Sequence, residues 1–132
     1  MAVFADTSGF FAVLDGADDN HGEARAAWEA FPFGSEPLIT HSYVCSETFG
    51  IVQRRLGVDA VRVLANELLP RVEIVWVDAL LQRRAVEALL AAGSRRVSLV
   101  DHLSFELMRL RGIDTAFAFD DDFLQAGFRL LA

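Results

Sequence analysis

Residues 97–123 constrain the fold more than any other part of the chain. The first half of this stretch spaces three leucines as one face of a helix does: Leu103, Leu107 and Leu110. Gly112 stands where a helix of this kind ends, and residues 115–119 form a short apolar run typical of a buried strand. A helix followed directly by a buried strand predicts an α/β domain, in which Asp101 lies in the first turn of the helix and Asp120 follows the strand.

The rest of the chain continues this alternation of short apolar runs and helical segments. Strands are expected at residues 2–5, 38–40, 72–77 and 128–131. Helices are expected at residues 10–14, 21–31, 41–56, 59–69 and 79–92, with a short helical turn near residue 123. Asp59 and Asp78 are the expected caps of the fourth and fifth of these helices. The pattern predicts one α/β domain over residues 1–132, with a mostly parallel central sheet and helices on both faces.

The charged residues exclude several kinds of function. All 12 basic residues are Arg, so a mechanism that needs a lysine amine, such as that of a P-loop, is excluded. The formal net charge of −7 disfavours nucleic acid binding over the whole surface, so any such binding needs local Arg clusters and a bound metal ion. The candidate pairs for this binding are Arg54 and Arg55, Arg95 and Arg96, and Arg109 and Arg111.

The remaining bulk features indicate a cytoplasmic protein. The single Cys45 excludes an internal disulfide framework and fits a reducing compartment. No apolar run approaches the ~18 residues of a membrane-spanning helix. The amino terminus has no basic segment and reaches Asp6 at once, so we expect neither a signal peptide nor a membrane partner.

Four acidic residues lie where an α/β domain is expected to place its loops, near the carboxyl ends of the strands. Asp6 and Asp120 each follow an expected strand, and Glu47 and Asp101 lie on expected helices. Any one of them taken alone can be a helix cap or a solvated side chain. Together they are like charges that raise one another's pKa unless a cation is bound. Oxygen ligands without paired His or Cys indicate Mg²⁺ or Mn²⁺.

The same segments resemble the four motifs of the PIN-domain nucleases. The matching segments are Phe4-Ala5-Asp6-Thr7-Ser8, Glu47, Ser98-Leu99-Val100-Asp101 and Phe119-Asp120-Asp121-Asp122-Phe123. The small size and the helix after Asp101 are similar to those of the VapC-type toxins of toxin–antitoxin pairs. The resemblance covers essentially the whole chain. It implies an Mg²⁺- or Mn²⁺-dependent endoribonuclease that hydrolyses RNA phosphodiester bonds with metal-activated water.

The resemblance also implies roles for particular residues. It gives four catalytic carboxylates that also bind the metal, Asp6, Glu47, Asp101 and Asp120, and a further metal ligand, Asp122. It gives three hydroxyl groups that line the metal and its waters, those of Thr7, Ser8 and Ser98. His102 is given no role.

Two protein partners are expected as well. The resemblance implies a cognate antitoxin, and we expect it to place an Arg-bearing segment among the acids, because a guanidinium forms bidentate pairs with carboxylates. The resemblance also implies a homodimer that pairs through helices. The sequence adds more aromatic residues in and after the first helices than a small core needs: Phe10, Phe11, Trp28, Phe31 and Phe33. The alternative is that these aromatics simply fill the core.

Other classes of protein are weighed against this interpretation. A response-regulator receiver and a haloacid-dehalogenase-type phosphatase both use a Lys that the chain lacks, and the phosphatase needs a second Asp where this chain has Ser8. Two alternatives stay open: a non-catalytic α/β module that binds a cation or a basic peptide, and a PIN nuclease that acts on DNA or flap structures. An assay of melting temperature and RNA cleavage with added Mn²⁺ distinguishes the first alternative from a ribonuclease.

Overall fold

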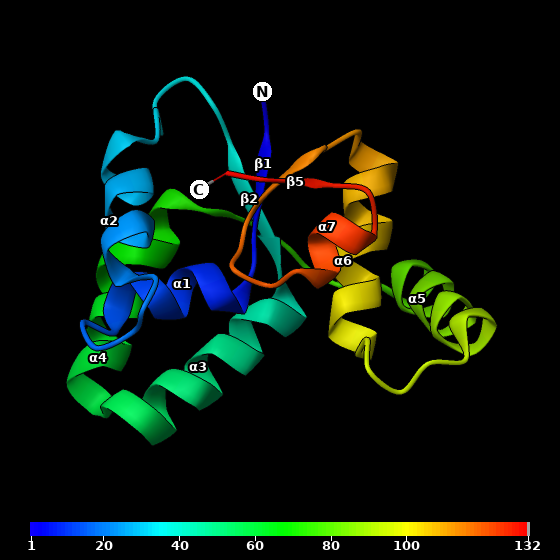
Figure 1. The fold of residues 1–132 in the computed structure, drawn as a ribbon, viewed down its shortest axis with the longest axis horizontal. Helices are drawn as coiled ribbons and strands as arrows, with labels where there is room; N and C mark the ends of the chain where they lie inside the picture. Colours follow the sequence, from blue (N-terminus) through cyan, green and yellow to red (C-terminus); the bar gives the residue numbers. More distant parts are fainter. Residues whose placement is uncertain (132) are drawn as a thin grey trace.

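A computed structural model describes residues 1–131, and its centre is a five-stranded parallel sheet (Figure 1). The strands are β1 (Val3–Ala5), β2 (Leu38–His41), β3 (Glu73–Val75), β4 (Thr115–Phe117) and β5 (Arg129–Leu130). Their order across the sheet is β3-β2-β1-β4-β5, and every neighbouring pair is parallel. The predicted α/β fold with a mostly parallel sheet is confirmed.

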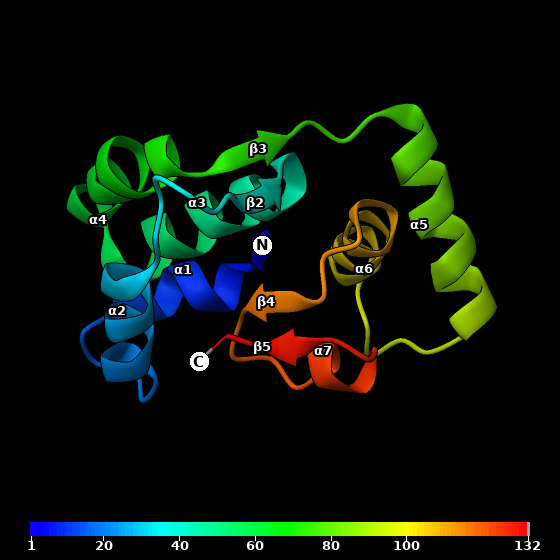
Figure 2. The same ribbon diagram turned by 90° about the horizontal axis from the view of Figure 1, so that it is seen from above.

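Helices cover both faces of the sheet. They are α1 (Thr7–Leu14), α2 (His21–Ala30), α3 (Ser42–Leu56), α4 (Val58–Val63), α5 (Ala79–Ala92), α6 (Leu99–Arg111) and α7 (Asp122–Gln125). A π-helical turn, η1 (Leu64–Leu68), and a 3₁₀ turn, η2 (Leu69–Arg71), continue α4. Figures 1 and 2 show α1 to α4 on one side of the sheet and α5 and α6 on the other.

The strand order predicts a ligand-binding crevice beside β1. The chain runs from β1 outward through β2 to β3, and then returns to β4 on the opposite side of β1. In open parallel sheets, ligands bind outside the carboxyl ends of the strands at the point where the order reverses. Here that point lies between β1 and β4. Asp6 directly follows β1, and Asp120 lies three residues after the end of β4.

The aromatic residues of the first helices fill the core. Phe10 is fully buried, and the other buried members of the set are at most 9% exposed: Phe11, Trp28 and Phe31. The ring centroids of Trp28 and Phe33 lie 4.9 Å apart. The expectation that these aromatics exceed the needs of the core is therefore wrong, because burying them against the sheet removes their apolar surface from water. Large apolar side chains are exposed elsewhere, among them Trp76 at 76%, Leu80 at 58% and Leu110 at 55%.

Several boundaries differ from those expected. The helix α1 begins at Thr7 rather than at residue 10, because the Asp6 carboxylate accepts a hydrogen bond from the Ser8 N–H and caps it. Asp59 is not the cap of α4, which follows Gly57 at φ 93°. The strand β3 is shorter than residues 72–77, and Leu110 is half exposed rather than part of the buried stripe on α6.

Other local expectations are confirmed. The Asp78 carboxylate caps α5 by accepting from the Leu81 N–H at 2.8 Å. Gly112 ends α6 in the left-handed conformation. Gly9 allows α1 to lie against β4, because a Cβ at this position would collide with the Phe117 carbonyl oxygen. Among the described helices, none is both long enough and apolar enough to span a membrane.

Candidate functional site

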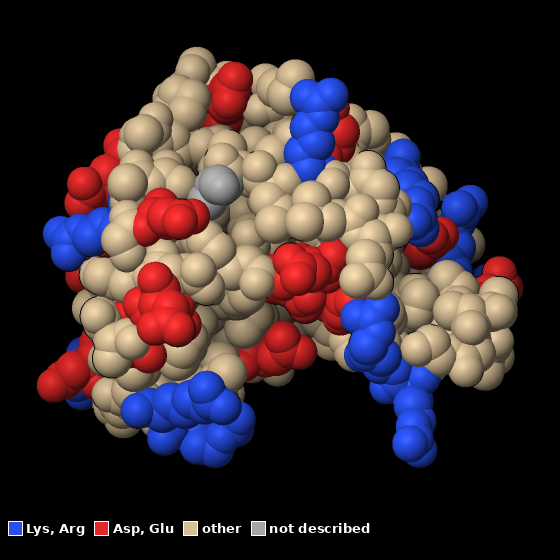
Figure 3. Space-filling model, in the orientation of Figure 1, with Lys and Arg blue, Asp and Glu red and all other residues tan. Residues whose placement is uncertain are grey.

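An acidic pocket of about 430 Å³ opens beside the carboxyl ends of β1 and β4. It brings together the four acids singled out in the sequence, Asp6 before α1, Glu47 on α3, Asp101 on α6 and Asp120 after β4, and a fifth acid, Asp18. The other lining residues are Thr7, Ser8, Phe11, Asn20, Ile51, Arg55, Ser98 and Phe119. Figure 3 shows acidic side chains in the middle of this face, between basic side chains on two sides.

Asp6 is the most buried of these acids, at 5% exposure. The Ser8 hydroxyl donates to Asp6 Oδ2 at 2.7 Å, and the Ser8 N–H donates to the same oxygen at 3.2 Å. The pKa of Asp6 is raised to about 6, mainly by burial; the two Ser8 hydrogen bonds oppose this rise, and the negative charges of Glu47 and Asp120 add to it. The Asp6 carboxyl group therefore keeps its proton to a higher pH than an ordinary Asp side chain does.

The three hydroxyl groups singled out in the sequence form hydrogen bonds that fix the segments around the pocket. The Ser8 hydroxyl also accepts from the Phe119 N–H at 3.0 Å, which links the segment after β1 to the segment after β4. The Thr7 and Thr48 hydroxyls lie 3.0 Å apart and join α1 to α3, beside Glu47. The Ser98 hydroxyl caps α6 by accepting from the Asp101 N–H at 3.2 Å. Each hydroxyl thus orients a segment that carries a carboxylate.

Three acids form the carboxylate trio: Asp101, Asp120 and Asp122. Each offers one oxygen, and these oxygens all lie within 4.8 Å of one another. The Asp122 N–H donates to Asp120 Oδ1 at 2.9 Å, which orders the loop that carries both. Asp6 and Glu47 line the pocket together with Asp101 and Asp120 but lie outside this group, whereas Asp122 belongs to the group but does not line the pocket. The structure thus divides the five expected metal ligands into a close trio and two neighbours.

The charge of the trio fits a divalent cation. The pKa of Asp101 is raised to about 7, mainly by burial and to a lesser extent by the negative charges of Asp6, Asp120 and Asp122. Oxygens bound to one Mg²⁺ at about 2.1 Å are at most about 4.2 Å apart, so small side-chain movements would suffice for coordination. The donors are all carboxylates, the ligand type that Mg²⁺ and Mn²⁺ prefer.

The arginine pairs differ in their positions. Arg55 lines the pocket, and Arg96 forms an ion pair with Asp122 of the trio. Arg109 and Arg111 pair with Glu106 and Glu73 respectively, and lie at the far end of α6. Arg109 lies eight positions after Asp101 on the helix, or about 12 Å along the axis. The structure therefore does not bring this third pair to the pocket.

Some of the surroundings of the pocket could not be found from the sequence. Asp18 and Asn20 line it from the turn after α1, yet in sequence this turn looks like any polar connection. The sequence does not indicate the Thr7–Thr48 contact or the Arg96–Asp122 ion pair either, because the two residues of each pair are 41 and 26 positions apart. Only the position of Thr48 next to Glu47 could have drawn attention to it.

Two buried histidines lie outside the lining of the pocket. His41 caps α3 by accepting from the Val44 N–H, and its Nε2 lies 2.9 Å from the Ser104 hydroxyl oxygen. Burial lowers the pKa of His41 to about 4, so this ring is neutral at physiological pH. His102 is also buried, and its Nε2 has no hydrogen-bond partner among the described residues.

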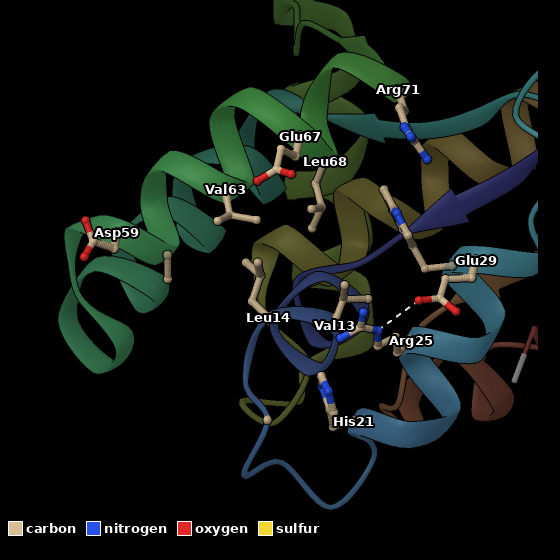
Figure 4. Close-up of a pocket in the computed structure, with 13 residues that line it drawn as sticks. Val13, Leu14, His21, Arg25, Glu29, Asp59, Val63, Glu67, Leu68 and Arg71 are labelled. Carbon is tan, nitrogen blue, oxygen red and sulfur yellow. Dashed lines mark hydrogen bonds and ion pairs between the residues drawn. The ribbon is translucent and has the colours of Figure 1, made fainter.

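A larger hollow, the α1–α2–α4 groove, has a different character (Figure 4). Its volume is about 650 Å³. Its apolar lining includes Val13, Leu14, Trp28, Val63 and Leu68. Its charged residues are of both signs, and Arg25 pairs with Glu29 at 2.9 Å. The groove mixes charges of both signs with apolar side chains, whereas the acidic pocket concentrates carboxylates, so the acidic pocket is the candidate active site.

Comparison with known proteins extends over nearly the whole chain. The PIN domain family model matches residues 3–129. The 23S rRNA-specific endonuclease VapC20 of Mycobacterium tuberculosis is 38% identical over 127 residues, which cover 96% of this chain and 95% of that protein. Its crystal structure, described as that of a sarcin–ricin loop cleaving toxin, covers the same shares of the two chains with a TM-score of 0.85 and 37% identity.

More distant structures share the fold. VapBC2 from Rickettsia felis, bound to a DNA fragment from its promoter, has a TM-score of 0.72 at 15% identity, with 98% of this chain and 97% of that chain covered. FitAcB from Neisseria gonorrhoeae has a TM-score of 0.69 at 15% identity, with 98% and 96% covered. At this level of identity the likeness shows the fold alone.

Proposed function

The chain belongs to the PIN domain family, and on that premise we propose that it is a VapC-type toxin that cleaves 23S ribosomal RNA. The family resemblance seen in the sequence is confirmed. The substrate is carried over from VapC20, which is 38% identical over nearly its whole length. The observation that carries the chemistry is the carboxylate trio, whose oxygens lie within 4.8 Å of one another. Such an activity belongs in the cytoplasm, where ribosomes are found.

We assign the trio to holding Mg²⁺ or Mn²⁺. A divalent cation in such a site supplies Lewis acidity to the phosphate and lowers the pKa of water. Asp6 and Glu47 face the same volume, and we assign them to orienting the attacking water. Both Ser8 hydrogen bonds go to Asp6 Oδ2, so Oδ1 is the oxygen that remains available for this role among residues 1–131. Because water attacks rather than the RNA 2′-hydroxyl, we expect 5′-phosphate and 3′-hydroxyl products.

Arginines on two sides of the pocket are placed to hold the RNA backbone. Figure 3 shows basic side chains over the far end of α3 and over the α5–α6 loop, with acidic side chains between them. Arg54 and Arg55 belong to the first group, and Arg95 to the second. No ion pair within residues 1–131 involves any of these three side chains. They are therefore available to phosphates, which an acidic protein otherwise repels.

The test is cleavage of a sarcin–ricin loop oligonucleotide with added Mn²⁺. We expect one specific cut in the RNA, none in a DNA oligonucleotide of the same sequence, and none in excess EDTA. A scrambled RNA hairpin is the control for specificity. Cleavage of the DNA alone would support the PIN nuclease alternative, and stabilisation by Mn²⁺ without any cleavage would support the binding module.

We further propose an antitoxin that occupies both hollows. The helix α1 connects them, because its start borders the acidic pocket while Val13 and Leu14 at its end line the groove. The separation along α1 is about 12 Å, which a few residues of a partner chain can span. Apolar residues of the partner would fill the groove, and an Arg would reach Asp6, Asp101 and Asp120. Inhibition should then weaken as Mg²⁺ rises, and it should weaken when that Arg is replaced by Ala.

We also propose a homodimer, but with its interface at a different surface from the aromatic residues of the first helices. Three exposed apolar side chains surround a hollow of about 280 Å³ between β3, α5 and α6: Trp76, Leu80 and Leu110. Exposed apolar surface of this kind is typical of association sites. We expect a dimeric mass by light scattering at micromolar concentration and a monomeric mass for Leu80→Asp. A monomeric wild-type protein would refute the proposal.

A further inference from the structure

Arg96 joins the two segments that carry the carboxylate trio. It lies in the loop between α5 and α6, two residues before Ser98, and its Nη1 donates to Asp122 Oδ1. Its Nη2 donates to Gln125 Oε1 at 2.8 Å. Asp122 and Gln125 are the first and last residues of α7, so the guanidinium spans the whole of this short helix. The loop that leads to Asp101 is thereby fastened to the helix that begins with Asp122.

Little else fixes the Asp122 side chain. The helix α7 has only four residues, and Asp121, its N-cap, makes no side-chain hydrogen bond. The Asp120 carboxylate accepts a hydrogen bond from the backbone N–H of Asp122, whereas the Asp122 carboxylate itself accepts from Arg96. The Asp122 side chain is 11% exposed, so it lies against the protein rather than in solvent. A carboxylate has lone pairs for both a guanidinium and a cation, so the ion pair leaves Asp122 able to coordinate.

We propose that Arg96 is a positioning residue for the divalent cation: it holds the Asp122 carboxylate beside Asp101 and Asp120 and so raises the affinity of the trio for Mg²⁺ or Mn²⁺. The inference rests on the proposed function in so far as that function places a cation at the trio. Partners that orient metal ligands from the second layer change metal affinity by about 10- to 100-fold. Arg96 is 60% exposed, so we expect an effect at the lower end of this range.

The positive charge of Arg96 and its positioning of Asp122 have opposite effects on the affinity for the cation. A nearby positive charge repels a cation, so its loss by itself would tighten metal binding. Arg95 offers a matched control, because it is the adjacent residue, is also exposed and takes part in no ion pair within residues 1–131. The difference between Arg96→Ala and Arg95→Ala therefore isolates positioning from charge.

The experiment is calorimetric titration of the metal-free protein with Mn²⁺, which needs no RNA. We expect Arg96→Ala to weaken Mn²⁺ binding about tenfold and Arg95→Ala to leave it unchanged or slightly tighter. Arg96→Lys should give an intermediate affinity, because an ammonium keeps the charge but lacks the planar fork. The melting temperature without Mn²⁺ shows whether each variant folds. Gln125→Ala, which removes one of the two contacts, gives a second and milder test.

A double-mutant cycle with Asp122→Asn decides whether Arg96 acts through Asp122. We expect Arg96→Ala to have no further effect on Mn²⁺ affinity once Asp122 is Asn. Equal affinities of Arg96→Ala and Arg95→Ala, or an undiminished Arg96→Ala effect in the Asp122→Asn protein, would overturn the inference while leaving the nuclease function intact. Absence of Mn²⁺ binding by the wild-type protein would overturn both the inference and the proposed metal site.

Discussion

The acidic pocket and the α1–α2–α4 groove lie at opposite ends of the same helix, yet they differ in what they can do. The groove is the larger, about 650 Å³ against about 430 Å³, but its charges have both signs and its lining is largely apolar. The pocket gathers five acidic residues against a single Arg, and burial raises the pKa of two of the acids, Asp6 and Asp101. Convergence of like charges, which costs energy without a cation, marks the active site better than volume does.

The largest expected effect is the loss of cleavage when the trio loses a charge. We expect Asp101→Asn to reduce RNA cleavage by more than about a hundredfold, because a metal ligand matters more than its supporting partners. Asp121→Asn is the matched control: it removes the same charge from an exposed residue of the same acidic run, and we expect less than about a twofold change. Initial rates with saturating Mn²⁺ measure both. Equal losses for the two variants would show that net charge, not the trio, governs activity.

A substitution in the groove should weaken antitoxin binding and leave RNA cleavage unchanged. A Val63→Arg substitution places a charge in its apolar lining, so we expect antitoxin affinity to fall by more than about tenfold, as at interface hot spots. Cleavage of RNA by the free toxin should be unchanged, because Val63 does not line the acidic pocket. Titration of the antitoxin against the variant, with cleavage as a parallel readout, measures the separation. If cleavage and antitoxin binding fall together, the two hollows are not independent.

The smallest expected effect is on the stability of the metal-free protein. The pKa of Asp6 is raised from 3.8 to about 6 and that of Asp101 to about 7, so between about pH 4 and pH 7 the folded protein binds more protons than the unfolded chain. The free energy of unfolding therefore falls as pH rises through this window.

Thermal unfolding in EDTA at pH 5 and pH 8 checks this dependence. We expect the wild-type protein to melt several degrees lower at pH 8, and Asp6→Asn to recover much of the difference. Saturating Mn²⁺ should also stabilise the protein at pH 8, since binding to the folded state alone stabilises it. Glu67→Gln in the groove is the charge-matched control, with no expected recovery. A wild-type melting temperature that rises steadily from pH 5 to pH 8 would contradict the assignment.

Much of the fold could be predicted because its signals are local. The Asp78 cap, the Gly112 stop and the alternation of apolar strands with helices each depend on a few neighbouring residues. The errors arose where tertiary contacts act. Leu110 continues the helical stripe but is half exposed, because it lines the open hollow between β3, α5 and α6. The aromatics of the first helices looked excessive only because the extent of the core is not visible in the sequence.

The sequence by itself determined the α/β alternation, the family and the placement of Asp6 and Asp120 after strands, because hydrophobic periodicity and capping are properties of short segments. Only the tertiary structure decided which acids meet. The return of the chain from β3 to β4 beside β1 brings Asp120 towards Asp6, and the packing of α6 and α7 brings Asp101, Asp120 and Asp122 within 4.8 Å. The Arg96 tie to Asp122 has the same origin, since a contact across 26 residues depends on the order of strands and not on local sequence.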